Sequence, residues 1–189
     1  MTKENYILSQ CKGKNVLDLG CVQDIAKVDS PDWLHAKIKE IATSLIGFDI
    51  IPIRKKGFHI YKVNLEEIFK ADSRFFDTVV AGDIIEHLSN PGMFLDNIKR
   101  LRFDKAIITT PNVMSPKYWT LGKEKVHKGH TCWYSMQTLS QLLSRKGFEI
   151  VDKSYGFDQK INGIRPLLRF LIYKILPQTG NKLLLTIQL

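Results

Sequence analysis

The chain has 189 residues, of which 44% are hydrophobic and 25% are charged. This balance suits one globular domain and excludes the disordered and fibrous classes. The formal net charge of +9 favours an acidic partner such as nucleic acid, an anionic lipid or a phosphorylated substrate, although the sign of the charge selects none of them.

The cysteines and the N-terminal segment indicate in which cellular compartment the protein is expected. Cys11, Cys21 and Cys132 show no CxxC spacing and are odd in number, so neither a zinc cluster nor a disulfide framework is expected. The first residues lack the apolar core of a signal peptide, and no apolar run approaches the ~20 residues that span a bilayer. We therefore expect a cytoplasmic protein that does not cross the membrane.

Apolar, strand-like runs alternate with helical patterns over most of the chain. The three helical patterns follow Ser30, Asn90 and Ser135, which are typical N-terminal residues of helices. The expected strands span residues 15–19, 45–49, 60–63, 76–81, 106–110 and 148–151, and the expected helices span residues 31–43, 91–102 and 135–146. This βαβ rhythm predicts a parallel sheet, and we expect residues 1–189 to form one domain because no linker or repeat divides them.

The C-terminal part of the chain has a different pattern. Residues 164–176 are predicted to form a helix whose apolar side chains cover most of its circumference, leaving a narrow stripe with Arg165, Arg169 and Tyr173. A last apolar strand is expected at 183–189. A helix on a sheet needs only one apolar face, so the apolar and basic segment 163–177 either packs inside the domain or makes a second contact, with an anionic membrane surface or in a homodimer. We favour burial inside the domain.

Polar residues follow the first two strands, and ligands of open parallel sheets bind beyond such strand ends. Gly20 lets the backbone turn tightly after the first strand, and Asp18 places a carboxylate beside it. The second strand ends in Asp49, which can accept hydrogen bonds from both hydroxyls of a ribose. The alternative for Asp49 is a solvated carboxylate in a turn.

Five segments in this order resemble class I S-adenosylmethionine-dependent methyltransferases. They are NVLDLGC at 15–21, Asp49, the segment 76–91 with its GDIIEHLSNP end, AIITTPN at 106–112, and the segment 130–148. The likeness is greatest to the small branch with ubiquinone-biosynthesis and glycan-cluster O-methyltransferases. It implies an α/β fold with a Rossmann-like, doubly wound, mostly parallel seven-stranded sheet and a terminal antiparallel hairpin, with S-adenosylmethionine as cofactor.

The resemblance also implies roles for individual residues. Asp49 would hold the ribose hydroxyls, and Asn64 would face the adenine amino group. The methionine part of the cofactor would be held by Asp18, Gly20, Ala81 and Gly82. The sequence departs from the family where Val22 and Asp24 replace two glycines of the usual GxGxG loop.

The segment Asp83-Ile84-Ile85-Glu86-His87 brings two carboxylates and an imidazole to one face of a helical turn. His127 and His130 lie farther along the chain. In some relatives a comparable acid-x-x-Glu-His with a distant histidine binds a divalent metal, which implies an Mg, Mn or Zn site at Asp83, Glu86, His87 and His130. The alternatives are a polar substrate site without metal and a purely structural helix start.

Methyl transfer needs an acceptor placed in line with the leaving sulfur, and a hydroxyl acceptor must lose its proton. A histidine, with an ordinary pKa near ~6.5, suits that task, so His87 and His130 are the catalytic candidates. Asn112, after another strand, can present both a donor and an acceptor to a substrate or can cap a turn.

The predicted function is O-methylation of a glycan, a lipid-linked intermediate or another small molecule. One alternative is RNA 2′-O-methylation, which the net charge favours but the lack of a recognisable RNA-binding module disfavours. The other is a degenerate, non-catalytic binding subunit, suggested by the missing glycines at 22 and 24.

Overall fold

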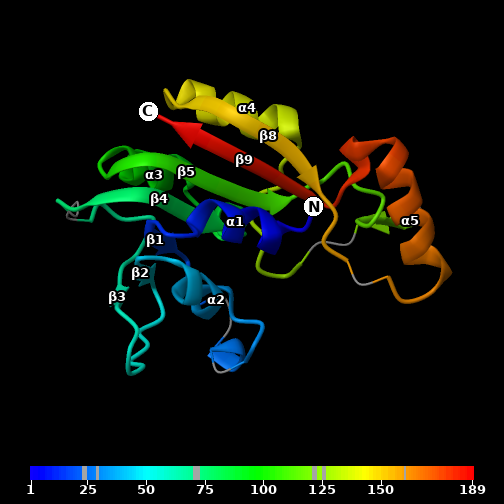
Figure 1. Cartoon of the computed structure of the whole chain (residues 1–189). Coiled ribbons are helices and arrows are strands. Elements are labelled where there is room, and N and C mark those ends of the chain that lie inside the picture. Colours follow the sequence, from blue (N-terminus) through cyan, green and yellow to red (C-terminus); the bar gives the residue numbers. More distant parts are fainter. Residues whose placement is uncertain (23–24, 29, 70–72, 121–122, 125–126, 160) are drawn as a thin grey trace.

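The computed structural model describes residues 1–22, 25–28, 30–69, 73–120, 123–124, 127–159 and 161–189 (Figure 1). Seven strands form one sheet in the order β3-β2-β1-β4-β5-β9-β8. These strands are β1 (Asn15–Leu19), β2 (Ser44–Asp49), β3 (Ile60–Lys62), β4 (Phe75–Gly82), β5 (Arg102–Pro111), β8 (Glu149–Gly156) and β9 (Lys182–Gln188). All neighbours are parallel except β9, which runs antiparallel to both β5 and β8. The predicted fold class is confirmed.

Helices cover both faces of the sheet (Figure 1). α1 (Lys3–Cys11) and α2 (Leu34–Ile41) pack on one face, against side chains such as Val80 and Ile107. α3 (Pro91–Lys99) and α4 (Met136–Arg145) pack on the other face, against side chains such as Val79 and Ile108. Because successive side chains of a strand point to opposite faces, each central strand contributes to both layers, which explains its continuous apolar run.

Several element boundaries differ from the predictions. The largest differences among the strands are in β5, predicted at 106–110 and observed at Arg102–Pro111, and in β8, predicted at 148–151 and observed at Glu149–Gly156. The first predicted helix begins at Leu34 rather than at residue 31, because Trp33 keeps an extended backbone and its indole N–H donates to the Cys21 carbonyl at 2.8 Å. The second ends at Lys99, and the chain enters β5 at Arg102. α1 was not predicted, although it buries Tyr6, Ile7 and Cys11. The short strands β6 (Trp119–Thr120) and β7 (Lys123–Glu124) were also not predicted.

α5 (Ile164–Ile175) differs most from the expectation. It connects β8 to β9 and stands beside the sheet instead of packing on either face (Figure 1). None of its residues is buried. The stripe with Arg169 and Tyr173 turns toward the domain, and the aliphatic residues face outward. The predicted burial of this helix inside the domain is therefore wrong.

Candidate active site

The loop after β1 meets the end of β2 at the carboxyl edge of the sheet. Gly20 adopts a left-handed backbone conformation with φ 74°, and its N–H donates to the Phe48 carbonyl at 2.8 Å. The buried carboxylate of Asp49 accepts from the N–H of Val22 at 2.8 Å and from the N–H of Ile51 at 2.9 Å. The two strand ends that the sequence singled out are thus joined by hydrogen bonds.

Gly20 is required both by its conformation and by its surroundings. A Cβ at this position would lie 2.8 Å from Ile84 Cδ1, and the positive φ disfavours any larger residue. We expect Gly20→Ala to lower the free energy of unfolding by about 2–4 kcal/mol, since left-handed strain and a steric clash add. Urea denaturation measures this loss.

Gly13→Ala is the matched control for this substitution. Gly13 has a similar φ of 68°, but a Cβ there meets no atom within 4 Å, so only the backbone strain applies. The control should lose about 1–2 kcal/mol. Equal losses in the two variants would contradict a steric role for Gly20.

The rest of the loop packs into a small apolar cluster. Cys21 and Val22 are buried with Val28 and Trp33, so a valine side chain fills the place where the family usually has a glycine. Burial, with a contribution from the charges of Asp18 and Asp49, raises the pKa of the Cys21 thiol well above its usual range. Asp24, the other departure from the glycine pattern, lies outside the described residues.

Other predicted cofactor residues occupy the same edge. The carboxylate of Asp18 is buried and bonds the His35 Nδ1 of α2 at 2.8 Å. Ala81 and Gly82 end β4, where Ala81 lies opposite Leu19 of β1 in the register. Asn64 follows β3 and stabilises its own turn, accepting from the Glu66 N–H at 3.1 Å and donating to Glu67 Oε1 at 2.8 Å. The cofactor roles of these residues remain predictions.

Asp83, directly after β4, connects three elements. Its φ of 54° is unusual for a residue other than glycine. The carboxylate pairs with Lys3 of α1 at 2.9 Å and with Lys182 of β9, and it accepts a hydrogen bond from the Thr109 hydroxyl at 3.0 Å. Burial opposes ionisation, but the ammonium groups of Lys182 and Lys3 outweigh it and hold the pKa of Asp83 well below its usual range.

Glu86 has a different environment although it lies only one turn farther along the chain. Its side chain is buried, and Oε2 accepts a hydrogen bond from the Thr110 hydroxyl at 2.9 Å. Burial, together with the negative charge of Asp83, raises the pKa of Glu86 to about 7. A carboxyl group with this pKa can exchange a proton near neutral pH.

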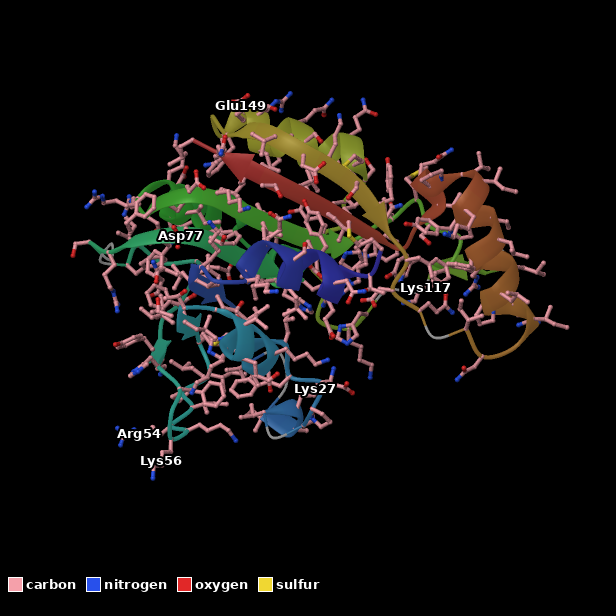
Figure 2. The ribbon with its side chains drawn as sticks, viewed as in Figure 1. Lys27, Arg54, Lys56, Asp77, Lys117 and Glu149 are labelled. Atoms are coloured by element: carbon pink, nitrogen blue, oxygen red, sulfur yellow. The ribbon has the colours of Figure 1, made fainter. Side chains whose placement is uncertain are left out.

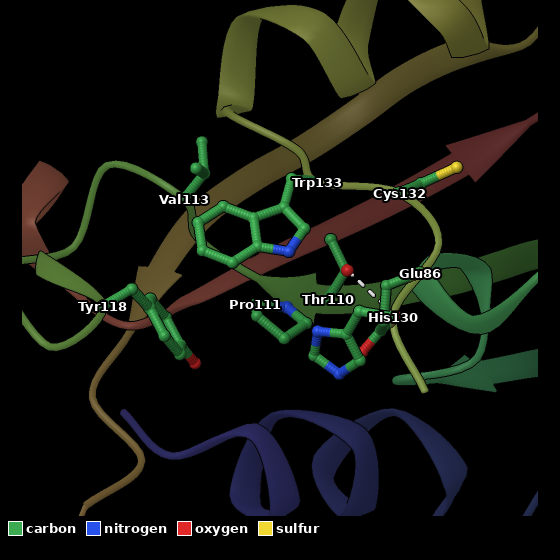
Figure 3. A pocket seen from close by; sticks show the side chains of 8 residues that line it. All are labelled: Glu86, Thr110, Pro111, Val113, Tyr118, His130, Cys132 and Trp133. Atoms are coloured by element: carbon green, nitrogen blue, oxygen red, sulfur yellow. Dashed lines mark hydrogen bonds between the residues drawn. The ribbon is translucent and has the colours of Figure 1, made fainter. Parts of the chain in front are cut away.

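A small pocket opens beside Glu86 at the end of β5 (Figure 3). Its lining consists of Glu86, Thr110, Pro111, Val113, Tyr118, His130, Cys132 and Trp133. Backbone hydrogen bonds explain why these distant segments meet, since Thr131 and Cys132 both donate N–H groups to the Glu86 carbonyl, at 2.8 and 3.2 Å. The pocket therefore combines a carboxyl, an imidazole and two aromatic walls.

The polar groups of this pocket have shifted pKa values. Burial and the neighbouring rings of His87 and His127 lower the pKa of His130 to about 4, so its imidazole is neutral at pH 7. Burial, with the charges of Asp83 and Glu86, raises the pKa of Tyr118 to about 12, so its hydroxyl keeps its proton. A neutral imidazole can accept a proton, but with a pKa of about 4 His130 is a weaker base than an ordinary histidine. A phenol can donate a hydrogen bond.

His130, which lines this pocket, forms a cluster of three imidazoles with His87 and His127. The centroid of the His130 ring lies 4.7 Å from that of His87 and 5.0 Å from that of His127. The nitrogen atoms that could ligate a metal lie within 4.8 Å of one another. His87 Nδ1 donates to the Gly129 carbonyl at 2.9 Å, which leaves Nε2 as the acceptor. These three rings could hold a divalent ion.

The predicted metal ligands are distributed differently over the structure. His87 and His130 lie together, and His127 joins them, although the sequence did not include it in the ligand set. The carboxylate of Asp83 instead forms ion pairs with Lys3 and Lys182, and the carboxyl of Glu86 accepts a hydrogen bond from the Thr110 hydroxyl. The metal site remains a prediction.

Asn112 is fully buried at the end of β5. Its amide donates to the carbonyls of Gln178 and Gly180, at 3.0 and 2.7 Å, and its oxygen accepts from the Met114 N–H at 3.1 Å. These bonds fasten the pocket segment to the connection between α5 and β9. The suggested role of Asn112 in substrate binding remains a prediction.

Sequence reasoning did not identify Thr110 and Tyr118 as pocket residues. Thr110 lies two residues before Asn112 in the TTPN segment, so its place at a strand end was the available signal. For Tyr118 there was no comparable signal, because its position depends on the course of the loop after β5.

Comparisons with known proteins agree with this arrangement. A methyltransferase-domain family model matches residues 5–153. The structure is similar to an S-adenosylmethionine-dependent methyltransferase from Mesorhizobium loti, with 15% identity, a TM-score of 0.62, and coverage of 98% of this chain and 97% of that chain. A methyltransferase from Archaeoglobus fulgidus gives 18% identity, a TM-score of 0.63, and coverage of 97% and 90%.

A third similar structure contains a product of methyl transfer. The N-methyltransferase NodS from Bradyrhizobium japonicum WM9, in complex with S-adenosylhomocysteine, gives 14% identity, a TM-score of 0.60, and coverage of 98% of this chain and 82% of that chain. No curated protein matches the chain in sequence. At these identities the structural likeness concerns the fold alone.

The chemistry of two residues at the carboxyl edge is compatible with the predicted site for S-adenosylmethionine. Asp49 offers a buried carboxylate for a ribose, and Gly20 forms the tight turn that allows close approach of the backbone. The family match covers most of the chain. In the sheet, the antiparallel strand β9 lies between β5 and β8. The chain therefore belongs to the methyltransferase-domain family and is a class I S-adenosylmethionine-dependent methyltransferase.

Proposed function

We propose that this enzyme methylates a hydroxyl oxygen of a small-molecule, glycan or lipid-linked acceptor. The observation that carries the proposal is the pocket at the end of β5, where a neutral His130 ring and the buried Glu86 carboxyl line one cavity. A hydroxyl is a poor nucleophile until it loses its proton, so a base in its binding pocket is the feature that an O-methyltransferase needs.

S-Adenosylmethionine, when bound, supplies an electrophilic methyl group on a positively charged sulfur. In our proposal Asp49 accepts hydrogen bonds from the ribose hydroxyls, because its carboxylate is preorganised by two backbone N–H groups. The remaining proposed cofactor contacts come from Asp18, Gly20, Asn64, Ala81 and Gly82.

His130 is the proposed base. As the acceptor oxygen forms its bond to the methyl carbon, the carbon–sulfur bond breaks with its electrons to sulfur, and the hydroxyl proton passes to the His130 ring. His87, which packs edge-on against His130, holds the orientation of that ring. The Glu86 carboxyl lies on the same pocket wall and, when ionised, favours the imidazolium that forms.

The pocket walls indicate the kind of acceptor. Tyr118 and Trp133 present aromatic faces, with ring centroids 6.0 Å apart, and Val113 and Pro111 add apolar surface. Aromatic faces pack well against the rings of sugars and phenols. We therefore place a saccharide or phenol ring against this aromatic pair, whose two rings are in contact with each other, with its hydroxyl toward His130.

Two measurements test this function. Calorimetric titration with S-adenosylhomocysteine should show one binding site per chain, and its absence would instead support a non-catalytic binding subunit. Radiolabelled S-adenosylmethionine should then transfer its methyl group to saccharide or phenol acceptors in a screen of free and lipid-linked compounds. Transfer only to amines, or only to the ribose of RNA with a strong dependence on salt, would contradict the proposed acceptor class.

A further inference from the structure

α5 is an amphipathic helix whose apolar side faces away from the protein. Its half-buried residues include Pro166, Phe170 and Tyr173, and the last two pack on Phe157 with ring centroids 5.4 and 5.5 Å apart. The Tyr173 hydroxyl also donates to the Tyr155 carbonyl of β8 at 2.9 Å. These contacts fix which side of the helix points outward.

The outer side of α5 carries an unusual amount of exposed aliphatic surface. The exposed fractions of its large apolar residues range from 43% to 80%. We call this set the outer face, and it comprises Ile164, Leu167, Leu168, Leu171, Ile172 and Ile175. A contiguous exposed patch of this kind on a soluble domain marks an interaction surface.

The charged side chains of α5 itself are all positive. Arg165 and Lys174 are exposed on α5, and the Lys174 ammonium lies 5.4 Å from the centroid of the Phe170 ring. The sequence from Gln159 to Leu189 contains no aspartate or glutamate. An apolar face flanked by cations is complementary to a bilayer with anionic headgroups. A second copy of the chain would bring like charges together and is a poorer match.

The length of α5 fixes how it would meet a bilayer. Its 12 residues span about 18 Å, whereas the hydrocarbon core is about 30 Å thick. Across the described parts of the chain, no helix has the length and apolarity needed for a crossing. α5 can therefore lie in the interface with its outer face among the acyl chains, but it cannot span them.

Hydrogen bonds connect the segment that follows α5 to the loop that lines the proposed acceptor pocket. The turn that follows α5, Pro177–Thr179, is bonded to the loop after β5. Asn112 donates to the Gln178 carbonyl, and the Ser115 hydroxyl donates to the Thr179 carbonyl, both at 3.0 Å. Lys117 of the same loop lies between the sheet and α5 (Figure 2). Since Val113 and Tyr118 of this loop line the pocket, a bilayer under α5 would lie beside its wall.

We propose that α5 docks the enzyme on an anionic membrane surface through its outer face and its flanking cations. The further step, that the docked enzyme takes a lipid-linked acceptor, rests on the proposed function. Membrane docking itself does not, because it can be measured without any methyl transfer.

Vesicle co-sedimentation tests the docking. The protein should sediment with vesicles that contain phosphatidylglycerol, less so at high salt, and should not sediment with pure phosphatidylcholine. The double substitution Leu168→Gln and Leu171→Gln should abolish binding without a loss of fold, because both side chains are exposed and glutamine is a good helix former. Ile68→Gln, at an aliphatic residue elsewhere that is even more exposed, should leave binding unchanged.

Charge variants separate specific docking from the general basicity of the protein. Arg165→Gln with Lys174→Gln should weaken vesicle binding about 30-fold, at about 1 kcal/mol for each cation. Arg54→Gln with Lys56→Gln removes the same charge from an exposed loop far from α5 and should have little effect (Figure 2). Equal losses in both pairs would overturn the assignment to α5.

Two further results would overturn the proposal. One is absence of binding to anionic vesicles at low salt by a protein that still binds S-adenosylhomocysteine. The other is a stable dimer by light scattering that the Leu168→Gln and Leu171→Gln substitutions dissociate, since the outer face would then be covered by a second copy. Vesicle binding without transfer to lipid-linked acceptors would instead support the docking and contradict only the acceptor.

Discussion

Replacing Asp49 with alanine is expected to weaken S-adenosylmethionine binding by about 30- to 700-fold, which corresponds to roughly 2–4 kcal/mol. The carboxylate would lose its bonds to two ribose hydroxyls, and these are charge-assisted. The N–H groups of Val22 and Ile51 would also lose their acceptor, so the loop after β1 would no longer be fastened to β2. Calorimetry measures the affinity, and urea denaturation measures the accompanying loss of stability.

Asp77→Ala is the matched control for this experiment. Its carboxylate also accepts a backbone N–H, that of Asn15 at 2.7 Å, but it lies near the amino end of β4, at the opposite edge of the sheet (Figure 2). A comparable loss of stability without a loss of affinity is expected. If the folded Asp49→Ala protein binds the cofactor as tightly as the wild type, Asp49 is not part of the cofactor site.

The parts of the fold that follow from local patterns could be predicted from the sequence. Residues 15–19 form β1 as predicted, because a continuous apolar run suits a strand that is buried on both faces. α4 begins after Ser135 as predicted, with the serine side chain accepting the Thr138 N–H at 3.2 Å. In both cases the determining interactions lie within the segment or depend on its apolar pattern alone.

The parts that depend on tertiary contacts could not be predicted. α1 has a weak apolar pattern, and its place on the sheet is fixed by side chains such as Tyr6, which bonds Thr186 at 2.7 Å. For α5, hydropathy favoured burial, whereas the packing of Phe170 and Tyr173 on Phe157 turns the aliphatic side outward. The hydropathy pattern indicates how apolar α5 is, but it does not predict which side of the helix packs against the domain.

The same distinction applies to the candidate site. Gly20 and Asp49 could be found because Gly20 follows β1 and Asp49 ends β2, and the carboxyl ends of parallel strands share one edge of the sheet. The pairing of Asp83 with Lys3 and Lys182 joins residues that are far apart in the chain and carries no local signal. Likewise, nothing in the spacing of His127 indicated that it would join His87 and His130.

His130→Asn is expected to lower the turnover by about 10²–10⁴-fold, because the acceptor hydroxyl would lose its proton acceptor. The affinity for S-adenosylmethionine should change little, since the proposed cofactor contacts lie at the carboxyl ends of β1, β2, β3 and β4 and do not include His130. Single-turnover measurements with radiolabelled cofactor separate the two effects. The same substitution at the exposed His59 is the control and should leave turnover unchanged.

A chelator distinguishes the two roles that the three imidazoles allow. If His130 acts as a free base, the wild-type turnover should persist after treatment with EDTA, and His127→Asn should reduce it only modestly, because His127 touches the base without lining the pocket. If a divalent ion bound by His87, His127 and His130 orients the acceptor, EDTA should abolish turnover and the three asparagine variants should be equally impaired. That second pattern would replace proton transfer to His130 with a metal-bound acceptor, since an imidazole whose lone pair binds a metal cannot also take a proton.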